Sequence, residues 1–176
     1  MHTDVESILI SEEEINLKCK ELAKRISEDY EGLKPVFVGL LKGSVPFMAE
    51  LMKYVTIDIY IDFMDVSSYS GTESVGDVRI NKDLDSSIQG EDIILVEDIV
   101  DTGKTLERVR SMMFQKGARS VRIVSLLDKP DCRVVEINAD YVGFTIPNEF
   151  VVGFGLDFNQ KYRNLPYIGI LKKECY

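Results

Sequence analysis

A run of apolar residues, 93–96, leads directly into an acidic segment and then into a stretch with helical spacing, 106–113. A short, fully apolar run bounded by turn residues is typical of a strand buried on both faces, as in a parallel sheet. The carboxylates of Glu97, Asp98 and Asp101 are therefore expected where a strand ends and a helix begins. This junction predicts an α/β fold, because parallel strands are commonly joined by helices.

The rest of the chain alternates in the same way. Ser11 and Glu14 form a capping box that starts a helix, and Gly32 and Pro35 end it. A second helix is expected over residues 46–53, which Pro46 opens. Strand patterns cover residues 36–41, 57–66, 78–80, 120–127, 141–144, 150–153 and 167–171. The alternation predicts a doubly wound α/β domain with a mostly parallel sheet, spanning residues 1–176.

Composition excludes several classes of function. The 176 residues, 45% of them hydrophobic, suit one domain with a substantial core. The longest apolar runs fall far short of the ~20 residues of a membrane helix. The net charge of −9 argues against a broad nucleic-acid surface. The acidic N-terminal residues do not resemble a secretory signal, and Cys19, Cys132 and Cys175 are too far apart for a disulfide framework, so a reducing cytoplasm is expected.

His2 is the only histidine, and we expect it in a mobile terminus. A lone histidine placed there excludes Ser-His-Asp and Cys-His mechanisms. Any acid–base chemistry must then fall to carboxylates, lysines or tyrosines.

The polar residues after the apolar run suggest a sugar phosphate as the ligand. Free backbone N–H groups and the helix dipole at a strand-to-helix junction favour a phosphate, which Thr102, Lys104 and Thr105 can reinforce. Placing Glu97 and Asp98 beside that phosphate is unfavourable unless a sugar separates them from it. The carboxylates can then bind ribose hydroxyls or a Mg²⁺ ion.

An ATP-type P-loop and an acidic surface loop without a function both fit this segment less well. A P-loop requires a glycine where Asp98 stands, and the charge and Cβ of Asp98 would obstruct a phosphate cradle. A functionless acidic loop would leave it unexplained why these residue types directly follow a buried strand.

The segment 96–105 resembles the phosphoribosyl-diphosphate signature of the type I phosphoribosyltransferases, and within them the hypoxanthine-guanine branch. The resemblance implies a Rossmann-like core with a small hood built from the terminal segments. It also implies a homodimer or homotetramer that binds 5-phosphoribosyl 1-diphosphate and 6-oxopurine bases with Mg²⁺. The phosphate- and ribose-binding residues would be Glu97, Asp98, Ile99, Val100, Asp101, Thr102, Gly103, Lys104 and Thr105.

Other segments resemble further motifs of the same family, and they follow one another along the chain in the family's order. The turn with Lys42 and Gly43 is expected to contact diphosphate through its backbone, although alone it is typical of an ordinary turn. Arg163 would also contact diphosphate. Ser68 and Tyr69 would be the first residues of a lid that closes over the reacting centre. The alternative is that residues 67–77 form a disordered connector.

The base would be held by residues near the ends of later strands. Alone, Lys129 is typical of a solvated turn, but the family's Asp-Lys-Pro makes it the lysine that donates to the purine 6-oxo group. By resemblance, Phe150 stacks on the purine and the backbone near Val151 reads its exocyclic edge. Ile99 and Asp157 would complete the base site. Asp157 would also join Glu97 and Asp98 around Mg²⁺.

The activity implied by the resemblance converts hypoxanthine or guanine plus 5-phosphoribosyl 1-diphosphate to IMP or GMP plus diphosphate. Asp101 would be the general acid or base for the purine ring proton. Alternatives are a phosphoribosyltransferase for adenine, xanthine or uracil, and a regulator that binds the diphosphate as a signal. The regulator would be expected to carry a basic face or a DNA-binding segment, and the sequence shows neither. A purely structural protein would leave residues 97–105 unexplained.

Overall fold

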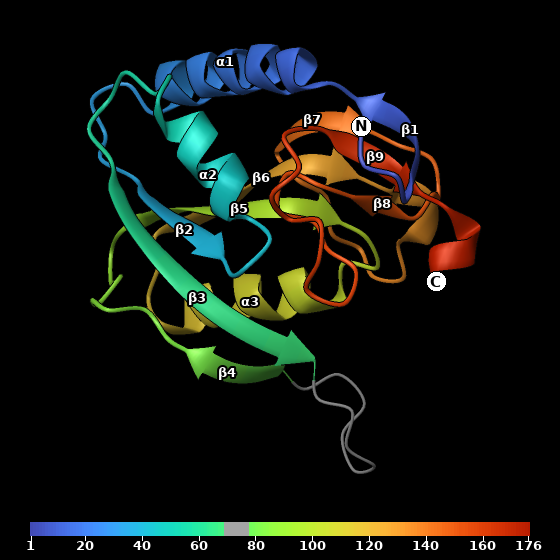
Figure 1. Ribbon diagram of the computed structural model, residues 1–176. Helices are drawn as coiled ribbons and strands as arrows, with labels where there is room; N and C mark the ends of the chain where they lie inside the picture. The colour runs from blue at the N-terminus through green and yellow to red at the C-terminus, as the bar shows by residue number, and fades with distance from the viewer. Residues whose placement is uncertain (69–77) are drawn as a thin grey trace.

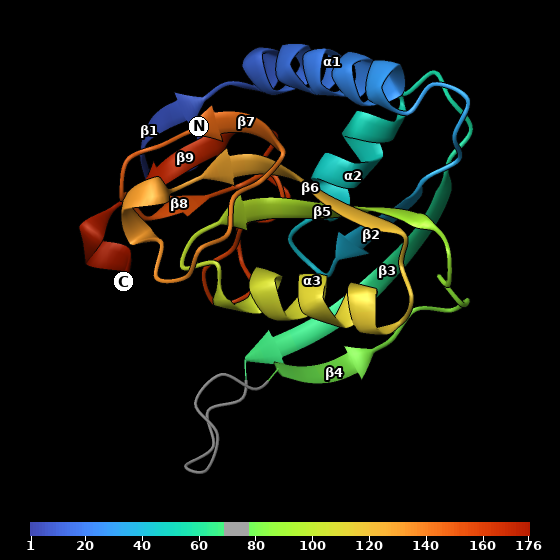
Figure 2. The same cartoon turned by 180° about the vertical axis from the view of Figure 1, so that it is seen from behind.

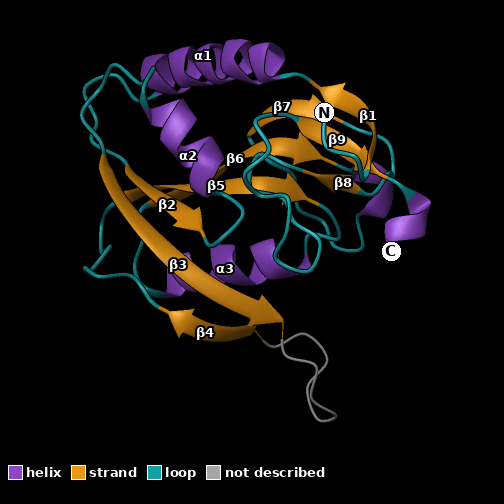
Figure 3. Cartoon of the chain, viewed as in Figure 1, coloured by secondary structure: helices purple, strands orange, loops and turns teal. Residues whose placement is uncertain are grey.

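The fold is built around a six-stranded sheet in the order β4-β3-β2-β5-β6-β7 (Figures 1 and 3). It is seen in a computed structural model that describes residues 1–68 and 78–176. All neighbouring strands are parallel except β3 and β4, which are antiparallel. The strands are β2 (Val36–Leu40), β3 (Tyr60–Ser68), β4 (Val78–Lys82), β5 (Asp92–Val100), β6 (Ser120–Asp128) and β7 (Tyr141–Thr145).

Helices cover both faces of this sheet. On one face lie α1 (Glu12–Asp29) and α2 (Val45–Met52), and on the other lies α3 (Lys104–Gln115), as the view from behind in Figure 2 shows. The predicted capping box is confirmed: the Glu14 backbone N–H donates to the Ser11 hydroxyl at 3.3 Å, and the Ser11 N–H donates to the Glu14 carboxylate at 2.8 Å. These bonds satisfy donors that the first helical turn leaves unpaired.

The apolar run in β5 alternates between two hydrophobic cores. Ile94 and Val96 pack in the core beneath α1 and α2, whereas Ile93 and Leu95 pack in the core beneath α3. Successive side chains of a strand point to opposite faces, so a strand covered on both faces must be apolar at every position. The doubly wound architecture predicted from this run is confirmed.

A second, antiparallel sheet forms a small hood from both ends of the chain. Its strands run in the order β1-β9-β8, with β1 at Val5–Ile10, β9 at Ile168–Leu171 and β8 at Val151–Val152. The hood lies beyond the carboxyl ends of β5 and β6 (Figures 1 and 2). Its own core contains Val5, Val152, Tyr167 and Leu171. Two short 3₁₀ turns, η1 (Pro130–Cys132) and η2 (Lys173–Cys175), complete the described elements.

Three sequence expectations need correction. The expectation of a mobile N-terminus around His2 is wrong, because the His2 N–H donates to the Tyr167 hydroxyl at 2.8 Å and β1 follows directly. β5 continues past residue 96 to Val100 because β6 pairs with it that far, so Glu97 and Asp98 belong to the strand itself. β3 begins at Tyr60 rather than at residue 57, opposite the first residue of β2.

Among the described residues, no helix combines the length and the apolar composition that crossing a membrane requires.

Candidate active site

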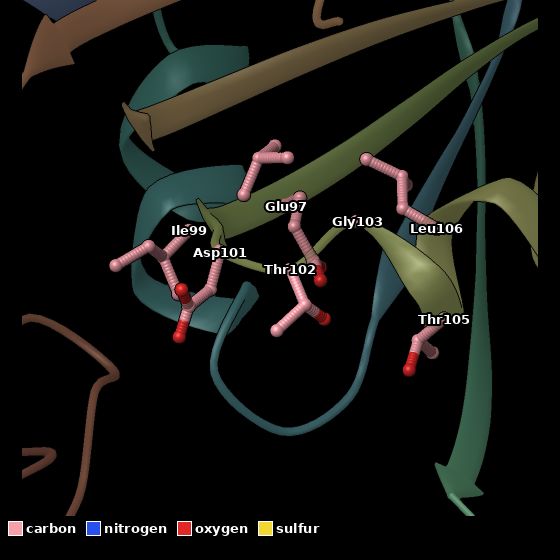
Figure 4. A pocket seen from close by; sticks show the side chains of 8 residues that line it. Glu97, Ile99, Asp101, Thr102, Gly103, Thr105 and Leu106 are labelled. Carbon is pink, nitrogen blue, oxygen red and sulfur yellow. The ribbon is translucent and has the colours of Figure 1, made fainter. Parts of the chain in front are cut away.

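Three adjoining cavities open at the carboxyl ends of β2, β5 and β6. The central one has a volume of about 120 Å³ and is lined mainly by the loop between β5 and α3. Figure 4 shows the oxygen atoms of Glu97, Asp101, Thr102 and Thr105 pointing to the same side of this loop. We call it the loop cavity, and its lining residues are Glu97, Ile99, Val100, Asp101, Thr102, Gly103, Thr105 and Leu106.

Gly103 allows the chain to turn from the loop after β5 into α3. It is the N-cap of α3 and has a φ of 82°, which glycine adopts without steric cost. A Cβ at this position would lie 2.5 Å from Cγ2 of Ile137. Helix α3 therefore begins at Lys104, two residues before the apolar spacing indicated, and its first N–H groups face the loop. Lys104 itself is exposed and does not line the loop cavity.

The second cavity, of about 230 Å³, lies between the turn after β2 and the end of β5. We call it the turn cavity. Gly43 is required there because a Cβ would lie 1.7 Å from Oδ2 of Asp98. A cis peptide bond joins Leu41 and Lys42. The lining residues are Leu40, Leu41, Lys42, Gly43, Val66, Glu97, Asp98, Thr105 and Arg163.

Glu97 and Asp98 form an electrostatically strained pair. Both residues are half-buried, and both line the turn cavity. Burial, and then the charge of Asp98, raises the pKa of Glu97 well above its usual range. Burial also raises the pKa of Asp98, although the Ile99 N–H, which donates to its carboxylate at 2.8 Å, opposes this. A cation bound here would relieve the repulsion when both groups are ionised.

The expected place of Asp157 beside Glu97 and Asp98 around Mg²⁺ stays a prediction, and the charge of Asp157 contributes to the raised pKa of Asp98. No group of three or more histidine, cysteine, aspartate or glutamate side chains suited to a metal occurs in the part of the chain that is described. Asp157 pairs with Arg163, at 2.8 Å between Oδ1 and Nη2. Arg163 also donates to the Gly155 carbonyl at 2.6 Å, which fixes its side chain at the edge of the turn cavity.

The third and largest of these cavities, of about 470 Å³, lies between β5, β6 and the hood. We call it the base cavity. The Lys129 side chain is buried and donates to the Glu149 carbonyl at 2.6 Å. The Lys129 backbone N–H donates to the Val100 carbonyl at 2.9 Å, which ties the end of β6 to the end of β5. The lining residues are Ile99, Asp101, Lys129, Asn148, Glu149, Phe150, Val151, Leu156, Asp157 and Tyr176.

Shared residues link the three cavities into one site. Glu97 and Thr105 line both the turn cavity and the loop cavity, whereas Ile99 and Asp101 line both the loop cavity and the base cavity. The loop cavity therefore lies in the middle, with Asp101 at its boundary with the base cavity.

Two residues near the site were not anticipated from the sequence. Arg133 donates to the Asp101 carbonyl and to the Asp128 carboxylate, and so joins the central loop to the end of β6. Tyr176 lines the base cavity and stacks on Phe150. The sequence gives no local signal for Arg133, whereas an aromatic residue after the polar segment 172–174 is a weak signal for Tyr176.

The lid expectation is not tested. Ser68 is the last residue of β3, and Tyr69 lies outside the described residues together with the rest of segment 69–77.

Residues 5–159 match the phosphoribosyl transferase domain family, which places the chain in the class of phosphoribosyl transferases. The chain is 54% identical to the hypoxanthine-guanine phosphoribosyltransferase of Streptococcus agalactiae, over 100% of this chain and 98% of the relative. The Streptococcus mutans relative of the same name is 55% identical over the same shares.

Solved structures agree with this assignment. A Staphylococcus aureus hypoxanthine phosphoribosyltransferase is 51% identical with a TM-score of 0.96, covering 100% of this chain and 96% of that one. The hypoxanthine phosphoribosyl transferase of Trypanosoma cruzi is 40% identical with a TM-score of 0.95, covering the same shares. The chain belongs to the hypoxanthine-guanine phosphoribosyltransferase family, a family of pentosyltransferases.

Proposed function

We propose that this protein transfers the 5-phosphoribosyl group of 5-phosphoribosyl 1-diphosphate to hypoxanthine or guanine, giving IMP or GMP and diphosphate. The observation that carries the proposal is the linear order of the three cavities around the end of β5. A phosphoribosyl diphosphate has its 5′-phosphate on one side of the ribose and its diphosphate on the other, and the attacking base must approach C1. The loop cavity offers a place for the ribose and its 5′-phosphate, the turn cavity a place for the diphosphate, and the base cavity a place for the base.

The 5′-phosphate would bind in the loop cavity. Backbone N–H groups at the start of α3, together with the hydroxyls of Thr102 and Thr105, suit a phosphate, and the helix dipole favours its negative charge. Ile99 and Val100 would flank the ribose from the end of β5. The diphosphate would bind in the turn cavity, against the backbone of Lys42 and Gly43 and near the guanidinium of Arg163.

A 6-oxopurine would bind in the base cavity. The buried ammonium of Lys129 is a donor there, and a 6-oxo group accepts from it where an adenine 6-amino group would not. Phe150 would stack on the ring, and the backbone at Val151 would read the exocyclic edge. Asp157 lies at the same cavity, held by its ion pair with Arg163.

Asp101 would hold or move the proton of the purine ring nitrogen as the bond to ribose forms. It lies at the boundary between the loop cavity and the base cavity, which is where that nitrogen must meet C1. The bond from C1 to the diphosphate breaks in the same reaction, and negative charge grows on the diphosphate. Arg163 and the N–H groups of the turn at Gly43 would stabilise this charge.

Glu97 and Asp98 would hold Mg²⁺ together with the ribose hydroxyls. The fit rests on two adjacent carboxyl-bearing residues that both line the turn cavity, and on the preference of Mg²⁺ for one or two carboxylates completed by substrate oxygens and water. The ion would supply charge neutralisation for the diphosphate. The reducing cytoplasm and the homodimer or homotetramer implied by the sequence remain part of this proposal.

The test is diphosphate release and nucleotide formation with a panel of hypoxanthine, guanine, xanthine, adenine and uracil, each with and without Mg²⁺. We expect turnover with hypoxanthine or guanine, dependent on Mg²⁺. Turnover with adenine or uracil alone would contradict the assignment of the base cavity. The absence of nucleotide with every base would contradict the proposed activity.

A further inference from the structure

The base cavity contains an aromatic residue that the proposed reaction does not use. The ring of Tyr176 stacks on the ring of Phe150, with centroids 4.5 Å apart and an interplanar angle of 24°. Phe158 meets Phe150 edge to face at 5.6 Å and 89°, and meets Tyr176 at 6.3 Å and 66°. We call these three rings the aromatic cluster. Such pairs contribute attraction beyond the area that they bury.

Hydrogen bonds and packing hold the segment before Tyr176 against the hood. The Lys172 N–H donates to the Asp4 carbonyl at 3.0 Å, and the Cys175 N–H donates to the Lys172 carbonyl at 2.9 Å, closing the turn η2. Cys175 packs on the apolar core of the hood. The segment before Tyr176 is therefore anchored, and the tyrosine ring is delivered to the cavity by a built turn.

The stacked pair leaves room for a base. With both rings in place, the base cavity still measures about 470 Å³. Ligand cavities range over roughly 300–1,000 Å³, so a purine does not need to displace Tyr176. Tyr176 and Phe150 both line this cavity.

Phe150 depends on its aromatic neighbours for a defined orientation, Phe158 in an edge-to-face contact and Tyr176 on a stacked face. The Phe150 side chain belongs to the surface, with 36% of the residue exposed, and rings in that setting change rotamer readily. Stacking against Tyr176 removes one face of Phe150 from solvent and restricts its rotation. A ring held in one orientation loses less conformational freedom when a base stacks on it.

We propose that Tyr176 is a positioning residue for the purine base, which acts by holding the Phe150 ring in the orientation that stacks on the base. This inference rests on the proposed function, because it concerns the same base cavity. It extends the base site to a residue outside the family signature segments.

The test compares Tyr176→Ala and Tyr176→Phe with the wild-type protein by steady-state kinetics. We expect Tyr176→Ala to raise the KM for hypoxanthine and guanine by about three- to tenfold, with kcat and the KM for phosphoribosyl diphosphate within about twofold of wild type. Tyr176→Phe keeps the ring and should keep wild-type constants. The matched control is Tyr60→Ala, an exposed tyrosine at the start of β3, far from the cavities, which should change neither KM.

A double-mutant cycle separates positioning from a direct contact. If Tyr176 acts through Phe150, adding Tyr176→Ala to Phe150→Leu should change the base KM less than about twofold. An unchanged base KM in Tyr176→Ala would overturn the inference, and so would a lowered one, because it would mean that the tyrosine competes with the base. Thermal unfolding of each variant excludes a general loss of structure. Failure of the proposed function is a separate result, since wild-type protein would then form no nucleotide.

Discussion

At the scale of single residues, Asp101 carries the acid–base chemistry proposed for this site. Its carboxylate faces the boundary of two cavities, while its backbone carbonyl accepts from Arg133. Asp101→Asn keeps the shape and removes the basic oxygen, so kcat should fall by about 10²- to 10⁴-fold with little change in stability. Steady-state turnover with saturating substrates measures this. A kcat within about twofold of wild type would remove Asp101 from the role.

Gly43 limits what the turn cavity can tolerate. A Cβ on this residue would overlap the carboxylate of Asp98, at 1.7 Å from Oδ2, and the carboxylate would have to move. Gly43→Ala should therefore raise the KM for phosphoribosyl diphosphate by about tenfold or more, because Asp98 and the turn backbone would both be displaced. Gly90→Ala is the control, since that glycine has a positive φ but no atom within 4 Å of an added Cβ. Equal effects of the two variants on KM would contradict this steric role of Gly43.

At the scale of elements, the sequence predicted what local patterns can carry. The four-residue apolar run identified β5, and the alternation around it identified the parallel sheet and its covering helices. The strand β1 was missed because its partner β9 lies at the other end of the chain, and no local pattern signals that pairing. The ion pair of Asp157 with Arg163 was not predicted, because it depends on the fold of segment 155–163. Arg133 depends on how η1 folds back on the loop after β5.

The segment after β6 braces the central loop. The Val134 N–H donates to the Thr102 carbonyl at 3.1 Å, and Arg133 bridges Asp101 and Asp128 with both side chains of the ion pair largely buried. Arg133→Met keeps the length of the side chain but leaves the Asp128 carboxylate without its partner. Breaking a buried pair costs about 3 kcal/mol, which corresponds to a fall of about 10 °C in Tm for a chain of this size.

The loss of bracing and the unpaired charge can be separated. Adding Asp128→Asn to Arg133→Met removes the unpaired charge and should restore part of the Tm. The KM for phosphoribosyl diphosphate should be raised in Arg133→Met and equally in the double variant, because the loop lacks its brace in both. Calorimetry and kinetics on the two variants measure these effects. A double variant with a wild-type KM would show that Arg133 does not position the loop.

At the scale of the whole molecule, the buried acidic pair opposes stability in the absence of ligand. Burial, and then the neighbouring charge of Asp98, raises the pKa of Glu97 in the folded protein. The folded state therefore retains a proton on Glu97 that the unfolded chain releases. This proton binding favours the folded state, and its contribution to the free energy of unfolding is full at low pH. It is lost as the pH rises from the ordinary glutamate range toward the raised pKa. Strain of this kind is typical of sites that are built for a ligand.

Glu97→Gln removes this titration, so the part of the pH dependence of stability that comes from Glu97 should be lost. Without Mg²⁺ and phosphoribosyl diphosphate, the Tm of the variant should exceed that of wild type by a margin that grows as the pH rises above the ordinary glutamate range. Glu107→Gln, at an exposed position in the first turn of α3, is the control and should give no such trend. With ligands at about 100 times Kd, the wild type should gain about 2.7 kcal/mol, and the variant much less, because it lacks the carboxylate that we propose binds them. Parallel pH profiles for wild type and Glu97→Gln would contradict the strained pair, whereas equal ligand stabilisation would contradict only its role in binding.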